Sequence, residues 1–183
     1  MRVYLAGPDV FFPDPVTWAE RKRAICLARG LTGVTPFDPV DAAPPCWAAL
    51  SEADRIARRN EAHIRGCDAM IANLTPFRGP SADAGTIYEV GFARALGRPV
   101  FAYTTVAAGL AERSRAACGG AGGQDAAGLA IEEFGLRENL MIDAGVREAG
   151  GWTVADLPAG QRWTDLDAFT RCVAAMAARR PNG

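Results

Sequence analysis

The sequence is poor in histidine, the side chain most often used as a metal ligand and as a general acid or base. It contains a single one, His63. A histidine-based zinc site and a mechanism with two histidines are therefore excluded. A Ser-His-Asp triad would have to use His63, and no GxSxG turn is present to carry the serine. These absences predict that no metal is bound, and they leave the carboxylates as the better-placed chemical groups.

The sequence also lacks the marks of a secreted, membrane-bound or nucleic-acid-binding protein. Its five cysteines are odd in number and form no CxxC pair, so we expect reduced thiols in a cytoplasmic protein. No apolar run approaches a membrane span, and residues 1–8 do not resemble a signal peptide. The 20 Lys and Arg residues balance 21 Asp and Glu residues, which leaves no basic field for nucleic acid. GxGxxG and Walker patterns are absent, so no dinucleotide or triphosphate cofactor is expected.

Short apolar segments alternate with helix-like segments, and this alternation predicts a parallel α/β sheet. The expected strands are 2–6, 33–36, 67–74, 98–104 and 151–156. The expected helices are 18–29, one that starts at Ser51 or Asp54 and runs to residue 65, 85–96 and 165–179, and the first of them is capped by Thr17. We predict a single domain over residues 1–183. Its fold is expected to be flavodoxin-like or Rossmann-like and doubly wound, with about five parallel strands and flanking helices.

Three segments fall outside this alternation. Residues 106–136 contain GGAGG and much alanine, and we expect a flexible insertion with partial helix that acts as a lid or an interface arm. Residues 37–47 form a proline-rich loop that either covers the site or connects two elements, and connection is slightly favoured. Residues 139–142, NLMI, form a compact apolar segment.

The stretch 81–96, SADAGTIYEVGFARAL, places two carboxylates, Asp83 and Glu89, on either side of a Gly-Thr turn. At helical spacing Glu89 shares an apolar stripe with Phe92 and Leu96. A carboxylate on such a stripe is costly unless it is paired or used in catalysis. The residues alone leave two interpretations open: a catalytic carboxylate, or a buried glutamate that caps a backbone group or meets an arginine.

Parallel strands of a doubly wound sheet bring their carboxyl ends to one crevice, where ligands bind. This crevice would gather Tyr4 with the first loop, the loop at 75–82, and the two carboxylates Asp83 and Glu89. Such a group suits cleavage of an N-glycosidic bond, in which one carboxylate attacks the anomeric carbon and the other handles the proton on the departing base. The rings that could stack on a nucleobase are those of Phe11, Phe12 and Phe77.

Three blocks, VYLAGPDVF, NLTPFRGPSADAGTIYEVGFA and FGLRENLMI, resemble the nucleoside 2-deoxyribosyltransferase family and occur in its order. They are most similar to the branch with purine preference or with mixed transferase and hydrolase activity. The resemblance extends from residue 2 to about residue 147, and the remaining C-terminal segment follows no pattern of the family. It implies an enzyme without a cofactor whose partners are 2'-deoxynucleosides and free nucleobases.

The resemblance also implies roles for individual residues. Glu89 would be the nucleophile that forms a covalent 2-deoxyribosyl-enzyme, and Tyr4 would hydrogen-bond and orient it. Asp83 would hydrogen-bond the base and assist its protonation, directly or through water. Asn139, with Met141 close by, would come from a neighbouring subunit, so at least a homodimer is implied. The further substrate contacts expected are Gly7, Asp9, Phe11, Asn60, Phe77 and Gly85.

Several of these positions have alternative explanations. Tyr4 could be an ordinary strand aromatic, and Asp83 and Asn139 could be helix N-caps, alone or in addition to a role in the site. His63 is better explained by helix packing than by catalysis. Asn60 corresponds to a position that is an acid contacting the base in some family members, and an amide there both donates and accepts.

Three other functions compete with base transfer. A hydrolase of the same architecture would use water as the acceptor, acting on 2'-deoxynucleosides or, less favourably, on their 5'-monophosphates. A phosphoribohydrolase is disfavoured because GTIYE matches only the end of the PGGxGTxxE motif. A non-catalytic nucleoside-binding module on the same fold is the third alternative.

Overall fold

The structure, a computed structural model, describes residues 1–40 and 43–179. Its five strands form one parallel sheet in the order β2-β1-β3-β4-β5. The strands are β1 (Arg2–Ala6), β2 (Thr32–Val34), β3 (Ala69–Asn73), β4 (Val100–Thr104) and β5 (Gly151–Val154). The predicted doubly wound, flavodoxin-like parallel sheet is therefore confirmed.

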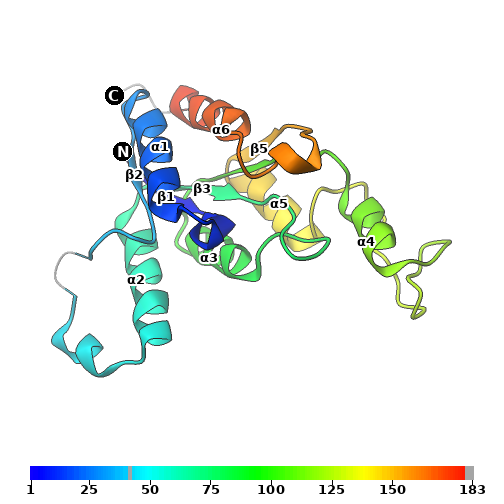
Figure 1. The fold of residues 1–183 in the computed structure, drawn as a ribbon, viewed down its shortest axis with the longest axis horizontal. Coiled ribbons are helices and arrows are strands. Elements are labelled where there is room, and N and C mark those ends of the chain that lie inside the picture. Colours follow the sequence, from blue (N-terminus) through cyan, green and yellow to red (C-terminus); the bar gives the residue numbers. More distant parts are fainter. Residues whose placement is uncertain (41–42, 180–183) are drawn as a thin grey trace.

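Helices cover both faces of the sheet (Figure 1). Those packed on it are α1 (Pro15–Leu27), α2 (Glu52–Gly66), α3 (Ala84–Ala95), α5 (Leu140–Ala149) and α6 (Asp167–Ala178). Side chains of α1 and α6 share a core with Val3 and Leu5 of β1, whereas those of α2, α3 and α5 share the other core with Tyr4 and Ala6. Side chains alternate along a strand, so Tyr4 faces α3. None of the helices in the described ranges is both long and apolar enough to span a membrane.

Two helix starts differ from expectation. The first helix begins at Pro15, and its N-cap is Asp14, whose Oδ1 accepts from the backbone N–H of Thr17 at 3.2 Å. The prediction of Thr17 as the cap was wrong because proline suits the first helical turn, where its fixed φ and missing N–H carry no penalty. Residues 139–142 are not a separate apolar segment, since Asn139 is the N-cap of α5 and the next three residues open that helix.

The segment 106–136 contains α4 (Leu110–Cys118) and a following loop with two isolated β-bridges, both of which involve Gln124. Figure 1 shows α4 and this loop projecting beyond the sheet. The base of the segment is closed by a hydrogen bond from the N–H of Leu110 to the carbonyl of Leu136, at 2.9 Å. Partial helix is thus present as expected, and the role as a lid or an interface arm stays a prediction.

A buried ion pair fixes the loop after β1. The ammonium group of Lys22 on α1 pairs with Oδ2 of Asp9, and their side chains are 3% and 16% exposed. Asn73, at the end of β3, donates from Nδ2 to the other oxygen of Asp9 at 3.0 Å. The ammonium group also lies 4.9 Å from the ring centroid of Phe169, a cation–π distance. This network ties α1 and the ends of β1 and β3 together.

We predict that Lys22→Met lowers the free energy of unfolding by about 3–5 kcal/mol, because it leaves the charge of Asp9 buried without its partner. The double variant Asp9→Asn/Lys22→Met should recover a large part of that loss, because it removes the unpaired negative charge. The amide oxygen introduced at position 9 still accepts the hydrogen bond from Asn73. Urea denaturation of the single and double variants measures both quantities. Equal stability of the two variants would contradict this account of the pair.

Candidate active site

Glu89 meets two hydrogen-bond donors from separate elements. The hydroxyl of Tyr4, on β1, donates to Oε1 of Glu89 at 2.8 Å. Nδ2 of Asn60, on α2, donates to the same oxygen at 3.2 Å. Oε2 of Glu89 receives no hydrogen bond from the described residues. In the described part of the chain, Glu89 has no arginine partner. Its Oε1 is held by two neutral donors and its Oε2 is available, which agrees with the interpretation as a catalytic carboxylate.

The environment raises the pKa of Glu89 to about 7. Burial is the main cause, and the negative charge of Asp83 adds to it, while the hydrogen bonds from Tyr4 and Asn60 act in the opposite direction. Burial and the charge of Glu89 hold the pKa of Tyr4 well above its ordinary value, so Tyr4 remains a neutral donor. At neutral pH a substantial fraction of Glu89 is therefore ionised and basic.

Asp83 is the N-cap of α3. Its Oδ2 accepts from the backbone N–H and from the hydroxyl of Thr86, both at 2.9 Å. Gly85 stands beside it, and a Cβ at that position would lie 3.2 Å from Oδ2. The cap occupies only one carboxylate oxygen, so capping and ligand binding are compatible at this residue.

A cavity of about 380 Å³ joins these groups at the carboxyl edge of the sheet. Its volume is within the range of small-molecule sites. Of the predicted site residues, the wall contains Gly7, Phe11, Asn60, Asp83, Gly85 and Glu89. The lining residues that sequence reasoning did not name as substrate contacts are Val10, Pro36, Phe37, Ile56, Arg59 and Thr86.

Two of these additional residues had a signal in the sequence. Phe37 belongs to the loop at 37–47, for which connection was slightly favoured over coverage of the site, yet its side chain forms part of the wall. Ile56 lies one helical turn before Asn60, so the helical period would have placed both on one face of α2. Arg59 carried no comparable signal, since α2 is rich in arginine.

Other predicted substrate contacts lie outside this cavity. The carboxylate of Asp9 faces Lys22 and Asn73. Phe77 stacks on Phe11, with ring centroids 5.4 Å apart and an interplanar angle of 12°, and it lines a neighbouring aromatic cavity. Their roles in substrate binding stay predictions. His63 bonds the carbonyl of Asp38 through Nε2 at 3.0 Å, which agrees with a packing role.

Asn139 and Met141 do not line the Glu89 cavity of their own chain. Asn139 caps α5, since its Oδ1 accepts from the N–H of Met141 at 3.0 Å. Its Nδ2 donates to Glu132 at 2.5 Å. The side chain of Met141 is 70% exposed. Their contribution to a neighbouring subunit's site stays a prediction.

A buried glutamate that sequence reasoning missed supports the loop before Asp83. Glu138 is 1% exposed, and its carboxylate accepts from the hydroxyl of Ser81 at 2.7 Å and the N–H of Ala82 at 3.0 Å. Arg113, on α4, pairs with the same carboxylate at 2.9 Å and donates to the carbonyl of Pro80 at 2.6 Å. The insertion and the residue before Asn139 thus hold the backbone that leads into Asp83.

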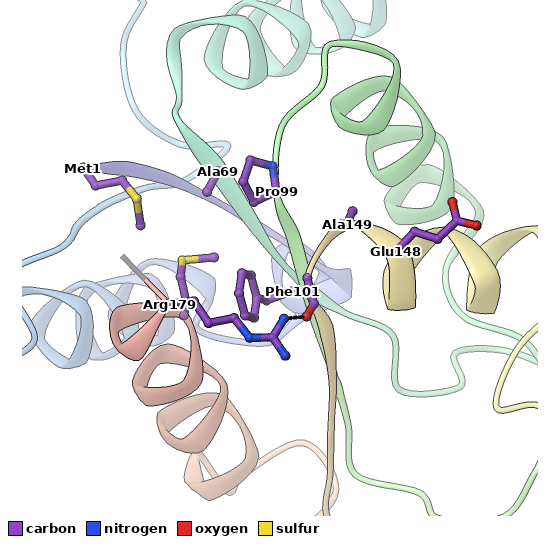
Figure 2. Close-up of a pocket in the computed structure, with 9 residues that line it drawn as sticks. Met1, Ala69, Pro99, Phe101, Glu148, Ala149 and Arg179 are labelled. Carbon is purple, nitrogen blue, oxygen red and sulfur yellow. Dashed lines mark hydrogen bonds between the residues drawn. The ribbon is translucent and has the colours of Figure 1, made fainter. Parts of the chain in front are cut away.

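A second cavity, of about 270 Å³, lies where β1, β3 and β4 begin, at the opposite edge of the sheet (Figure 2). Its charged groups are already engaged, because Arg179 donates to the carbonyl of Gly150 and Glu148 pairs with Arg94 at 2.8 Å. In the described part of the chain, no cluster of His, Cys, Asp and Glu side chains is arranged to hold a metal ion.

The fold and the Glu89 cavity define a doubly wound α/β protein with a carboxylate-lined cavity at the carboxyl edge of its sheet, where ligands of such sheets bind. Within that class, residues 3–141 match the model of the nucleoside 2-deoxyribosyltransferase family, and the chain belongs to this family. The resemblance of the three sequence blocks is thereby confirmed.

Three relatives illustrate the relationship. A 2-desoxiribosyltransferase from Leishmania mexicana has 31% identity and a TM-score of 0.66, with 94% of this chain and 97% of that chain covered. A conserved protein from Enterococcus faecalis V583 shares the fold at 18% identity and a TM-score of 0.57, over 96% of this chain and 98% of that one. An uncharacterized protein of Schizosaccharomyces pombe is 31% identical to this chain, and the alignment covers 97% of this chain and 89% of the relative.

We predict that Tyr4→Phe raises the pKa of Glu89 further above about 7. The lost hydrogen bond stabilises the ionised carboxylate, and such bonds contribute about 1.5–3 kcal/mol, or about one pKa unit or more. Carbon-13 NMR titration of the glutamate carboxyls measures the change. Tyr88→Phe is the matched control, because the hydroxyl of Tyr88 bonds Glu61 on the surface at 2.7 Å. An unchanged or lowered pKa in Tyr4→Phe would refute the assigned effect of this bond.

We predict that Glu138→Gln loosens the loop before Asp83, because it removes the charge that pairs with the largely buried Arg113. Hydrogen exchange at the amide of Ala82 should accelerate at least about tenfold, which corresponds to roughly 1.4 kcal/mol. Glu133→Gln is the control: this side chain is 45% exposed and pairs with Arg115 on the same insertion. Equal exchange rates in the two variants would show that Glu138 does not hold the loop.

Proposed function

We propose that the protein is a nucleoside 2-deoxyribosyltransferase that moves 2-deoxyribose from one nucleobase to another through a covalent intermediate on Glu89. The observation that carries the proposal is the geometry of Glu89, a cavity-lining carboxylate whose Oε1 is held by the buried hydroxyl of Tyr4. Membership of the family and the likeness to the Leishmania mexicana transferase support it.

In the first step, Oε2 of Glu89 attacks the anomeric carbon of the bound 2'-deoxynucleoside. The bond from that carbon to the base nitrogen breaks, and its electron pair leaves with the base. Asp83 relays a proton to the base, directly or through water. The hydrogen bonds of Tyr4 and Asn60 support this assignment, because both engage Oε1 and leave Oε2 to form the new bond.

In the second step, a nitrogen of the incoming base attacks the anomeric carbon and releases the carboxylate of Glu89. The incoming base loses its proton to Asp83, which restores the starting state. Each displacement inverts the anomeric carbon, so the two together retain the configuration. The ring of Phe11 supports the binding of flat bases in both steps, since it is exposed and lines the cavity.

The proposed enzyme is at least a homodimer, with Asn139 and Met141 completing the site of a neighbouring subunit. Their position outside their own chain's cavity supports this, as do two exposed apolar side chains of the segment 134–141. Phe134 and Met141 are 65% and 70% exposed, and apolar surface of this kind often marks a protein interface.

The test is a product time course with 2'-deoxyinosine, in the presence and absence of adenine. The wild type should form hypoxanthine and 2'-deoxyadenosine. Glu89→Gln and Glu89→Ala should lose at least about 1,000-fold in rate, as expected for removal of a nucleophile. Glu61→Gln, a change of the glutamate bound by Tyr88, is the matched control and should retain activity.

Three results would contradict the proposal. Near-normal exchange in Glu89→Ala would remove Glu89 from the mechanism. Release of hypoxanthine without formation of 2'-deoxyadenosine would identify a hydrolase. Ligand-induced thermal stabilisation without any base release would identify a binding module. Detection of a 2-deoxyribosyl adduct on Glu89 by intact mass would support the covalent step directly.

A further inference from the structure

The aromatic cavity that neighbours the Glu89 cavity has a volume of about 450 Å³. The two cavities share one lining residue, Phe11. Four more rings line the aromatic cavity, and they come from three parts of the chain: Phe12 and Trp18, Phe77 after β3, and Trp163 after β5. Residue 163 lies beyond the range that matches the family model, so the wall is completed by a segment that the family pattern does not describe.

A buried threonine pair holds the loop of Phe77 against the loop of Trp163. The hydroxyl groups of Thr75 and Thr105 lie 3.2 Å apart, and both residues are buried. The hydroxyl of Thr105 also donates to the carbonyl of Arg162 at 3.3 Å. The fold itself therefore keeps these two walls of the cavity in place.

The rings of Phe12, Trp18, Phe77 and Trp163, here called the aromatic cage, meet at steep angles. Phe12 is inclined by 65° to Trp18 and by 73° to Trp163, with ring centroids 5.6 and 5.7 Å apart. Trp163 is inclined by 85° to Phe77, at 5.9 Å. A flat base binds by stacking on parallel ring faces, whereas steeply inclined walls surround a rounded group. The cage therefore favours a compact, rounded ligand group over a flat one.

The charge of the wall favours a cation. Asp14 is the one charged residue among the described residues that line the cavity, and it is exposed. Its Oδ1 caps α1, and its Oδ2 receives no hydrogen bond from the described residues. The faces of aromatic rings carry the negative end of their quadrupole, and tryptophan offers the best such face. A carboxylate and ring faces together attract a positive group.

The apolar character of the rings narrows the kind of cation. A metal ion or a bare ammonium ion would lose hydration without gaining contacts from apolar walls. An ammonium group that carries methyl groups is less strongly hydrated, and its methyl groups contact the ring faces. Aromatic cages recognise quaternary ammonium ligands in this way. The cavity volume is within the range of small-molecule sites.

The chain's own cations show that these ring faces attract positive charge. The guanidinium carbon of Arg21 lies 4.7 Å from the ring centroid of Trp18, and that of Arg78 lies 4.7 Å from the ring centroid of Phe77. Both arginines are exposed, and neither lines the cavity. Solvent and salt screen their charges, so they weaken the attraction for a further cation without cancelling it.

We propose that the aromatic cage binds a small organic cation through a methylated ammonium group, with Asp14 as its counter-charge. This site is separate from the Glu89 carboxylate, and the inference does not rest on the proposed function. Because Phe11 lines both cavities, the bound cation lies beside a wall of the Glu89 cavity.

The experiment is isothermal titration calorimetry of the full chain with choline and with 3,3-dimethylbutan-1-ol, which has carbon in place of the charged nitrogen. The wild type should bind choline at least about tenfold more tightly than the alcohol, as expected for desolvated cation–π contacts. Trp163→Leu should weaken choline binding about tenfold, and Trp163→Phe, which keeps a ring, should weaken it less. Thermal melting shows that both variants fold.

The contribution of charge is measured with the same titration. Asp14→Asn should weaken choline binding about threefold or more, because the amide keeps the cap of α1 but removes the charge. Arg21→Gln should tighten it about twofold, because it removes a repelling cation. Glu52→Gln, at an exposed acid in the first turn of α2, is the matched control and should leave the affinity unchanged.

Three results would overturn the proposal. The first is equal affinity for choline and the alcohol, or no binding of choline at about 10 mM. The second is tighter binding of free adenine than of choline that is lost in Trp163→Leu, which identifies a second nucleobase site. The third is sedimentation with phosphatidylcholine vesicles in preference to binding of free choline, which identifies a lipid surface. None of these measurements involves turnover, so they are decided independently of the proposed function.

Discussion

The hydrogen bond from Tyr4 to the buried carboxylate of Glu89 is the interaction on which the rest of the site depends. Burial alone would keep Glu89 protonated, and a full ion pair would hold it ionised but weakly nucleophilic. Neutral donors from Tyr4 and Asn60 give the intermediate outcome, a carboxylate with a pKa of about 7 and one oxygen still unoccupied. The fully buried position of Tyr4 makes this donor rigid, because its ring is packed in the core between β1 and α2.

The second carboxylate depends on a separate support. Asp83 caps α3 through one oxygen, which fixes its direction, and the backbone before it is held by Glu138 and Arg113. Arg113 belongs to the 106–136 segment and bonds the carbonyl of Pro80, so the base of this segment is anchored to the site independently of its distal loop. Glu138 directly precedes Asn139, and one buried carboxylate therefore links the Asp83 loop to the start of α5.

Much of the fold could be predicted from the sequence because its signals are local. Alternating apolar and helix-like segments predicted the five strands and their parallel order. Cap assignment was less secure: Thr17 was expected to cap the first helix, but Pro15 favours a start three residues earlier, with Asp14 as the cap. Asn139 was open between a cap and a site residue, and in the described chain it is a cap. Such differences arise within one helical turn, where several residues compete for the same backbone N–H groups.

The sequence by itself determined the order of the elements, the two candidate carboxylates and the family, since periodicity and motifs are properties of short segments. Only the tertiary structure decided which atoms meet. Tyr4 lies 85 residues before Glu89, and their contact depends on strand register and on the rotation of α3 about its axis. The same long-range packing directed Asp9 to Lys22 and brought Arg59 into the wall of the Glu89 cavity. Pairings of this kind are set by how whole elements pack, and no short stretch of sequence specifies them.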